Sequence, residues 1–259
     1  SSSAASDVYK RQSVVIEEFM EGEEASVLCF TDGSTIVPMI SAQDHKRISD
    51  GDMGANTGGM GAYAPAPVIT KELDKIVYDT ILLPAVKAMK KEGCPFKGCL
   101  YAGLMITKDG PKVVEFNCRF GDPETEAVLP LLESDLAKIM LACTKGTLKK
   151  ERVEWKNACA VDVVLASEGY PATHSSGEEI VGLEEAKKTG CLVFHAGSMK
   201  KKGRYFVNGG RVLNVAAVAP TLKEARDKAY EGVSKISWRG MQYRHDIADK
   251  GLKRSKKGK

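Results

Sequence analysis

Residues 113–119 read Val-Val-Glu-Phe-Asn-Cys-Arg and are the most informative stretch of the chain. Side chains alternate across a β-strand, so Glu115, Asn117 and Arg119 are expected to share one face. That face would present a carboxylate and an amide oxygen beside a guanidinium. Hard cations such as Mg²⁺ take such oxygen ligands, and a neighbouring arginine neutralises a transferring phosphoryl group. The pattern predicts a metal and phosphate site, and the alternative is a solvent-facing strand with a surface salt bridge.

The segment Gly121-Asp122-Pro123-Glu124 follows this strand directly. Asp122 is expected to cap a helix whose first residue is Pro123, and a helix N-terminus beside a metal and an arginine favours anions. On the strand itself, Phe116 and Cys118 are expected to face the other way, toward apolar packing. The connection therefore favours the site interpretation over the surface alternative.

Two hairpins are predicted upstream. Residues 98–107 and 112–119 flank one Asp-Gly turn, and residues 25–30 and 35–40 flank another. Residues 41–67 lie between them and show little periodicity and many glycines. Loops of this length inside a compact domain are usually functional or disordered.

One helix is predicted between the hairpins, over residues 70–91, where apolar residues recur with helical spacing. Thr70 is a suitable N-cap and Gly93 a suitable stop. Pro84 should kink or split this helix, because proline lacks the amide donor that the helix interior needs.

The long segment 41–67 contains two polar patterns. Residues 52–61 are rich in glycine, which lets backbone amides approach an anion closely, and a structural turn explains the same pattern equally well. Residues 43–47, Gln-Asp-His-Lys-Arg, form a dense polar cluster that is also typical of a charged surface loop. Further upstream, residues 17–24 combine acids with apolar side chains at an expected strand end. Such a segment fits an adenine pocket with one glutamate on the ribose, or an acidic turn.

The C-terminal part predicts a small α+β domain. Helices are expected at residues 123–132 and 134–143, and the polar segment 144–157 marks a domain boundary. A final helix begins at Thr221, with Glu224 at the capping-box position. Its apolar stripe comprises Ala225, Ala229, Val233 and Ile236. The expected strands cover residues 158–166, 192–196, 204–207 and 212–218.

Composition excludes several classes of protein. The chain has 259 residues, 43% of them hydrophobic, which suffices for a packed core. No apolar run is long enough to cross a bilayer. The seven cysteines are odd in number and include no Cys-x-x-Cys pair, so we expect neither a disulfide framework nor a zinc site, and we expect a reducing, cytosol-like compartment.

The two ends of the chain differ from its body. Residues 1–12 are rich in Ser and Ala and are interpreted as a foreign leader joined to a truncated chain. The net charge of +4 comes from the tail, because the last seven residues carry five positive charges. Such a tail is usually solvated and mobile, and nucleic-acid binding is the less favoured alternative.

Several long strings resemble the glycinamide ribonucleotide synthetase family, the phosphoribosylamine–glycine ligases of the ATP-grasp superfamily. The pattern is an acidic–hydrophobic hinge, a Gly-rich loop and a Glu-x-Asn-x-Arg strand. The resemblance covers about residues 14–247. The strings are VVIEEFMEGEEAS, QDHKR, NTGGMGAYAPAP, LYAGLM, EFNCRFGDPETE, SEGYP, VFHAG and NGGRVLNV.

The resemblance implies an α/β (α+β) fold, with the large lobe of an ATP-grasp domain over residues 13–147. A small α+β C-terminal domain at 148–252 and a basic tail at 253–259 would follow. The implied reaction joins glycine to 5-phosphoribosylamine and converts ATP to ADP and phosphate through glycyl phosphate. The implied enzyme is cytoplasmic and monomeric, with ATP, glycine and phosphoribosylamine as partners and neither membrane nor nucleic acid.

The resemblance also assigns residues. Glu115 and Asn117 would hold Mg²⁺ or Mn²⁺, and Arg119 would be catalytic and contact substrate. The implied ATP contacts are Glu17, Glu18, Phe19, Met20 and Glu24. The implied glycine and phosphoribosylamine contacts are Asp44, Asn56, Thr57, Gly58, Gly59, Met60 and Gly61. His174, His195 and His245 are expected to be structural.

Two departures from the family pattern bear on activity. The N-terminal domain and the small ATP-grasp lobe are not found before the hinge, so this chain alone is expected to be nearly inactive. The expected strand segment 101–105 carries no acidic residue, so the coordination shell of the metal ion must be completed by other ligands. The alternatives are another ATP-grasp carboxylate–amine ligase or a non-catalytic binding fragment.

Overall fold

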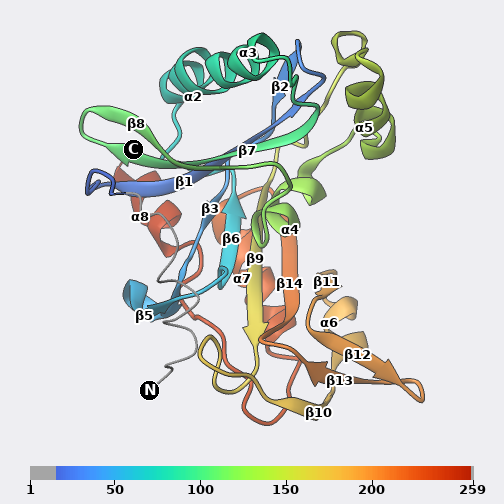
Figure 1. Ribbon diagram of the computed structural model, residues 1–259. Coiled ribbons are helices and arrows are strands. Elements are labelled where there is room, and N and C mark those ends of the chain that lie inside the picture. Colours follow the sequence, from blue (N-terminus) through green and yellow to red (C-terminus); the bar gives the residue numbers. More distant parts are fainter. Residues whose placement is uncertain (1–15, 258–259) are drawn as a thin grey trace, which may run out of the picture.

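A four-stranded antiparallel sheet occupies one end of the molecule, in the order β2-β1-β7-β8 (Figure 1). The structure is a computed structural model that describes residues 16–257. Its strands are β1 (Glu23–Thr31), β2 (Ile36–Pro38), β7 (Gly98–Thr107) and β8 (Gly110–Asn117). Both hairpins are therefore confirmed, and β1 pairs with β7 along its whole length.

The predicted long helix covers one face of this sheet as two pieces, α2 (Lys71–Val77) and α3 (Leu83–Lys91). The Thr70 hydroxyl accepts a hydrogen bond from the first turn, as expected of an N-cap. A π-helical turn, η2 (Tyr78–Leu82), separates the pieces just before Pro84. The interruption is confirmed, and its physical reason is the amide that proline lacks.

The opposite face of the sheet packs on α4 (Glu124–Val128), the 3-10 turn η3 (Leu129–Leu131) and α5 (Leu136–Lys145). Asp135 caps α5 through its side chain, and Gly146 ends it in the left-handed conformation. A further 3-10 turn, η4 (Leu148–Lys150), completes this layer.

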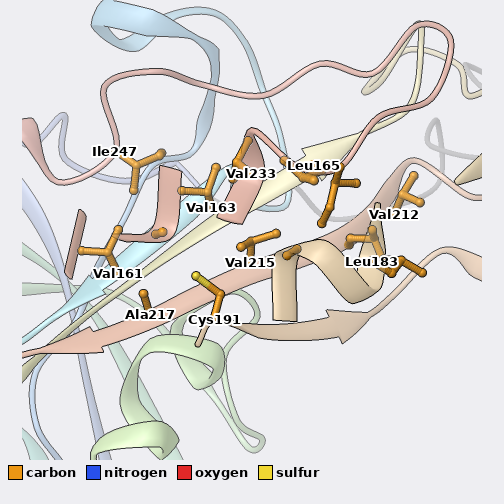
Figure 2. Packing of buried hydrophobic residues seen from close by; sticks show 14 of the residues in the cluster. Val161, Val163, Leu165, Leu183, Cys191, Val212, Val215, Ala217, Val233 and Ile247 are labelled. Atoms are coloured by element: carbon orange, nitrogen blue, oxygen red, sulfur yellow. The ribbon is translucent and has the colours of Figure 1, made fainter. Parts of the chain in front are cut away.

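A second antiparallel sheet has the order β11-β14-β9-β6-β3. Its strands are β3 (Gln43–Asp44), β6 (Gly61–Ala64), β9 (Cys159–Ala166), β11 (Leu192–His195) and β14 (Arg211–Ala219). One face packs against α7 (Leu222–Val233) in a cluster of buried aliphatic residues (Figure 2). The other face lies toward α4, so this helix is shared by both sheets.

The remaining elements surround the second sheet. A smaller sheet comprises β10 (Ser176–Ile180), β13 (Arg204–Asn208) and β12 (Ser198–Lys201), beside α6 (Leu183–Lys188). The hairpin β4 (Arg47–Ser49) and β5 (Met53–Asn56) encloses the 3-10 turn η1 (Asp50–Asp52). The capping box of α7 forms between Thr221 and Glu224, as predicted. No helix within residues 16–257 is long and apolar enough to span a membrane.

Three expectations require correction. Residues 41–67 are not an irregular loop, because β3 to β6 lie within them and β6 pairs with β9. The polar cluster 43–47 is not a surface loop, since Gln43, Asp44 and His45 are buried. The basic tail is helical up to Lys257 in α8 (Asp249–Lys257), where Arg254 forms an ion pair with Glu23 of β1.

The domain boundary after residue 147 stays a prediction. The second sheet crosses it, because β3 and β6 come from one side and β9, β11 and β14 from the other. The predicted leader at residues 1–12 lies outside the described residues.

Candidate functional site

The three polar side chains of the most informative stretch contact one another, as predicted. Asn117 Nδ2 donates to Glu115 Oε1 at 3.0 Å, and Arg119 Nη2 donates to Asn117 Oδ1 at 3.4 Å. Arg119 lies beyond the last residue of β8, yet its guanidinium reaches back to the strand. The alternation rule thus places a carboxylate and an amide together on an edge strand, and the guanidinium joins them from just beyond its end.

The same edge position leaves the other face of β8 half open. Phe116 retains 46% of its surface exposed, and Cys118 is exposed. Both line an apolar groove of about 390 Å³ against α3. The expected apolar packing of these two side chains is therefore incomplete on β8, which is an edge strand among the residues that the structure describes.

The oxygen atoms present fit a hard cation only in part. Glu115 and Asn117 supply a carboxylate and an amide, which suits Mg²⁺ when phosphate oxygens complete its shell. Gly103 lies opposite Glu115 on β7, and a Cβ there would come within 3.2 Å of Glu115 Cγ. Within residues 16–257, no group of three or more His, Cys, Asp or Glu side chains is arranged to hold a metal.

A cleft of about 450 Å³ lies between the expected hinge and the β7–β8 turn. Glu18, Phe19 and Met20 line it from one side, and Lys112 faces them with its Nζ 2.7 Å from a Glu18 oxygen. Residues 16–22 form no strand, which corrects the expected strand end. Because β1 begins only at Glu23, these residues have no ladder partner, and Phe19 is 87% exposed.

A second, polar cavity of about 250 Å³ adjoins the first at Gly22. It brings together three of the predicted contacts, Glu24, Asp44 and Asn56. The sequence interpretation missed several other lining side chains as individual contacts, namely Lys46, Arg47, Asp52 and Lys250. Lys46 pairs with Glu24 at 2.9 Å. Lys250 has no local sequence signal, because the fold brings it from α8.

Asp44 is a carboxyl group that faces this cavity and whose pKa is strongly raised. Burial raises its pKa to about 7, repulsion from Glu124 adds to the effect, and the Lys46 ammonium opposes it. Glu124 is itself buried, and its Oε1 accepts hydrogen bonds from Ser26 Oγ and Tyr101 Oη, both at 2.8 Å. Sequence reasoning treated Glu124 only as a helix residue, so this second buried carboxylate was missed.

An ionic network around the buried Arg244 guanidinium adjoins the cavity at Asp52. Both Nε and Nη2 of Arg244 donate to Asp246, at 2.8 and 2.7 Å, and Nη1 donates to Asp52 at 3.0 Å. The Arg244 guanidinium helps to hold the pKa of Asp246 well below its usual range. His45 is buried beside this network, which lowers the pKa of its imidazole. The network fixes the β4–β5 hairpin to the segment before α8.

The Gly-rich loop uses its amides within the protein. Gly58 N donates to Tyr170 Oη at 3.0 Å, and Gly59 N donates to Thr57 Oγ1 at 2.9 Å. Met60 N donates to a backbone carbonyl at 2.8 Å. For these three amides the structure favours the structural-turn alternative over an anion cradle. Gly61 already belongs to β6.

Asp122 does not cap a helix, which corrects another expectation. The Asp122–Pro123 peptide bond is cis, Pro123 itself precedes α4, and no side chain caps that helix. The Asp122 carboxylate instead pairs with Arg211 Nη1 at 3.0 Å. The helix α4 has only five residues, so its N-terminus does not by itself define an anion site.

Comparisons with known proteins agree with this arrangement. Residues 6–125 match the family model "Phosphoribosylglycinamide synthetase, ATP-grasp (A) domain" and residues 160–250 match "Phosphoribosylglycinamide synthetase, C domain". The first match begins inside the segment that we interpreted as a leader.

Curated relatives include the trifunctional purine biosynthetic protein adenosine-3 of Gallus gallus, which is 54% identical over 93% of this chain and 24% of its own length. The chloroplastic phosphoribosylamine–glycine ligase of Arabidopsis thaliana is 51% identical over 93% of this chain and 46% of its own length. The phosphoribosylamine–glycine ligase of Vibrio vulnificus is 48% identical, and 56% of it is covered. The chain thus spans about half, or less, of these relatives.

Among solved structures, the phosphoribosylamine–glycine ligase of Thermotoga maritima superposes with a TM-score of 0.78 at 38% identity, over 89% of this chain and 56% of that one. The N5-carboxyaminoimidazole ribonucleotide synthetase of the same organism reaches a TM-score of 0.59 at 20% identity, which shows a common fold alone. The two family models and these relatives agree, and the chain belongs to the phosphoribosylglycinamide synthetase family of ATP-grasp proteins.

Proposed function

We propose that this chain carries the phosphoryl-transfer and substrate-binding part of an enzyme that ligates glycine to 5-phosphoribosylamine with ATP. The products would be glycinamide ribonucleotide, ADP and phosphate, a step of purine synthesis. The observation that carries the proposal is the chain of contacts from Glu115 through Asn117 of β8 to Arg119 just beyond it. The names of the relatives supply the substrates.

Each group has a role in the proposed reaction. The glycine carboxylate attacks the γ-phosphorus of ATP, the bond to ADP breaks, and glycyl phosphate forms. The amine of phosphoribosylamine then attacks the carbonyl carbon and displaces phosphate. Arg119 would neutralise charge on the transferring phosphoryl group. Such reactions depend mainly on positioning and charge neutralisation, which these side chains can supply.

Glu115 and Asn117 would hold Mg²⁺ or Mn²⁺, which would supply charge neutralisation for the phosphates when bound. The cleft at Glu18, Phe19 and Met20 would take the adenine, and Glu24 at the adjoining cavity would take the ribose. Glu17 would belong to the same hinge, although it does not line the cleft.

Asp44 and Asn56 would contact glycine or phosphoribosylamine, because both line the polar cavity that Glu24 shares. Residues 57–61 would shape this site mainly through their backbone. Their amides are largely committed to protein acceptors.

We further propose a cytoplasmic monomer. All seven cysteines lie in the described residues, and none forms a disulfide. Burial raises the pKa of both Cys29 and Cys99 to about 12, so these thiols serve as core residues rather than nucleophiles.

A turnover assay tests the proposal. The full-length product of the source gene would receive ATP, Mg²⁺, glycine and fresh phosphoribosylamine, and mass spectrometry would identify the product. We expect glycine-dependent ADP release that falls about a hundredfold to a thousandfold in Glu115→Ala. Arg204→Ala, on a distant surface hairpin, is the matched control. A well-folded protein without turnover, or Glu115→Ala with full turnover, would reject the assignment.

A further inference from the structure

Two C-terminal strings converge on the candidate site, although the proposed function gives neither a role. Arg211 begins β14 and comes from NGGRVLNV, and Tyr170 follows β9 and comes from SEGYP. Arg211 Nη1 lies 2.9 Å from the Gly58 carbonyl oxygen and 3.4 Å from that of Gly59. It also lies 3.0 Å from the Asp122 carbonyl oxygen. One guanidinium nitrogen thus contacts the Gly-rich loop and the turn after the metal-site strand.

Tyr170 binds the same loop through the backbone amide of Gly58, whereas Arg211 binds the carbonyl oxygen of that residue. Its hydroxyl oxygen accepts the Gly58 amide at 3.0 Å, so both the N–H and the C=O of this residue are bound by C-terminal side chains. Gly210 lies against the Tyr170 ring, where a Cβ would come within 2.4 Å of Cδ2. The tyrosine is therefore fixed by the residue that precedes Arg211.

The Gly-rich loop packs tightly against Arg211 and against the turn that contains Pro123. Gly59 has φ of +115°, and a Cβ there would lie 2.4 Å from Pro123 Cδ. A Cβ on Gly58 would lie 3.1 Å from the Arg211 guanidinium carbon. At Gly59 both the positive φ and the contact with Pro123 require glycine, whereas a Cβ at Gly58 would only press on the Arg211 guanidinium.

Electrostatics favour the same arrangement. The Arg211 side chain is 21% exposed, and its hydrogen bonds to carbonyl oxygens are charge-assisted. Beneath it lie two acids, Glu126 and Asp162, each with a buried oxygen that has no hydrogen-bond partner. Burial raises the pKa of both carboxyl groups, and the Arg211 charge acts in the opposite direction. The Arg211 charge therefore also favours the ionised forms of these two carboxyl groups.

We propose that Arg211, assisted by Tyr170, is a positioning residue that locks the Gly-rich loop to the turn following the metal-site strand. In this way the C-terminal segment sets the affinity for the non-nucleotide substrates. The structural part of this inference stands on the contacts alone, and its kinetic part rests on the proposed function. Asn56, two residues before Gly58, lines the polar cavity, and through it the lock would act on substrate binding.

Hydrogen exchange on the present chain tests the lock without any need for activity. Arg211→Lys keeps the positive charge near Glu126 and Asp162 but loses the planar fork. We expect amide exchange over residues 57–60 and 119–122 to become about tenfold faster or more, with other regions unchanged. Tyr170→Phe should affect residues 57–60 alone. Arg204→Lys is the matched control, because Arg204 Nη1 forms a surface ion pair with Glu179 at 3.0 Å.

Kinetics on the full-length product of the source gene test the substrate role. We expect Arg211→Lys to raise the KM for glycine or phosphoribosylamine about tenfold, with kcat and the KM for ATP within about twofold. Unchanged exchange in either loop would overturn the lock. A fall in kcat with unchanged KM values would overturn the positioning role. If the unsubstituted enzyme shows no turnover, the proposed function fails while the exchange result still decides the lock.

Discussion

Replacement of Asp44 by Asn should stabilise the protein at alkaline pH. Asp44 is only 8% exposed, and its pKa is raised to about 7 from an ordinary value of 3.8 by burial and by the neighbouring Glu124. The folded chain therefore binds this proton more tightly than the unfolded chain does. It follows that the contribution of Asp44 to the free energy of unfolding falls as pH rises from about 4 to about 7, and remains low above that range.

The magnitude follows from the two pKa values. The rise in the pKa of Asp44 from 3.8 to about 7 on folding corresponds to a loss of roughly 4 kcal/mol in the free energy of unfolding at pH 8. At pH 5 the loss is smaller, roughly 1–2 kcal/mol, because most of the titration of the folded state lies above that pH. Asn carries no charge at either pH. The gain from Asp44→Asn should therefore be about 2–3 kcal/mol larger at pH 8 than at pH 5.

The assay is urea-induced unfolding of both proteins at pH 5 and pH 8, followed by circular dichroism. Glu124→Gln provides a second test, because loss of the neighbouring charge should lower the pKa of Asp44, as measured by carboxyl-carbon NMR titration. If Asp44→Asn raises the free energy of unfolding equally at the two pH values, the reasoning is refuted. A variant that is less stable than the parent at pH 8 would refute it equally. A carboxyl group that costs stability and faces a cavity is expected to serve a ligand.

Two further stability predictions use the same unfolding assay. Arg244→Met should cost about 2–3 kcal/mol, because Asp246 would lose its buried partner while the partly exposed Asp52 would keep Lys250. A cost below about 1 kcal/mol would contradict this account of the network. Thr221→Ala should cost about 1 kcal/mol and lower Tm by roughly 2–4 °C, since it removes the capping box of α7; an unchanged Tm would show that packing alone holds the helix start.

Local patterns predicted the parts of the fold that local forces determine. The two Asp-Gly turns and the Thr70 and Thr221 caps form within a few residues of sequence, and each is present in the structure. The contact of Glu115 with Asn117 follows from strand alternation, which is equally local. A short-range rule therefore identified the residues that carry the proposed metal site.

Local sequence patterns failed to predict the strands in residues 41–67, because these strands form by long-range pairing. The strand β6 has the sequence Gly-Ala-Tyr-Ala, which shows neither β-branched residues nor polar alternation. It becomes a central strand because Gly61 pairs with Val163 across about a hundred residues. Gly61 has φ of +147°, and a Cβ there would lie 2.5 Å from the Asp162 carbonyl oxygen. The close approach that requires this glycine is invisible without the partner strand.

The same reasoning explains which site residues were missed. Glu124, Arg211 and Lys250 give no local signal, because each acquires its role from a contact made by the tertiary fold. The pKa of Asp44 is raised because the fold buries this carboxyl group and, to a lesser extent, because β3 places it near Glu124 of α4, which lies between the two sheets. The perturbed chemistry of the site thus depends on the junction of the sheets. A substitution that loosens this junction should therefore lower the pKa of Asp44, even where it leaves every residue of the cavity in place.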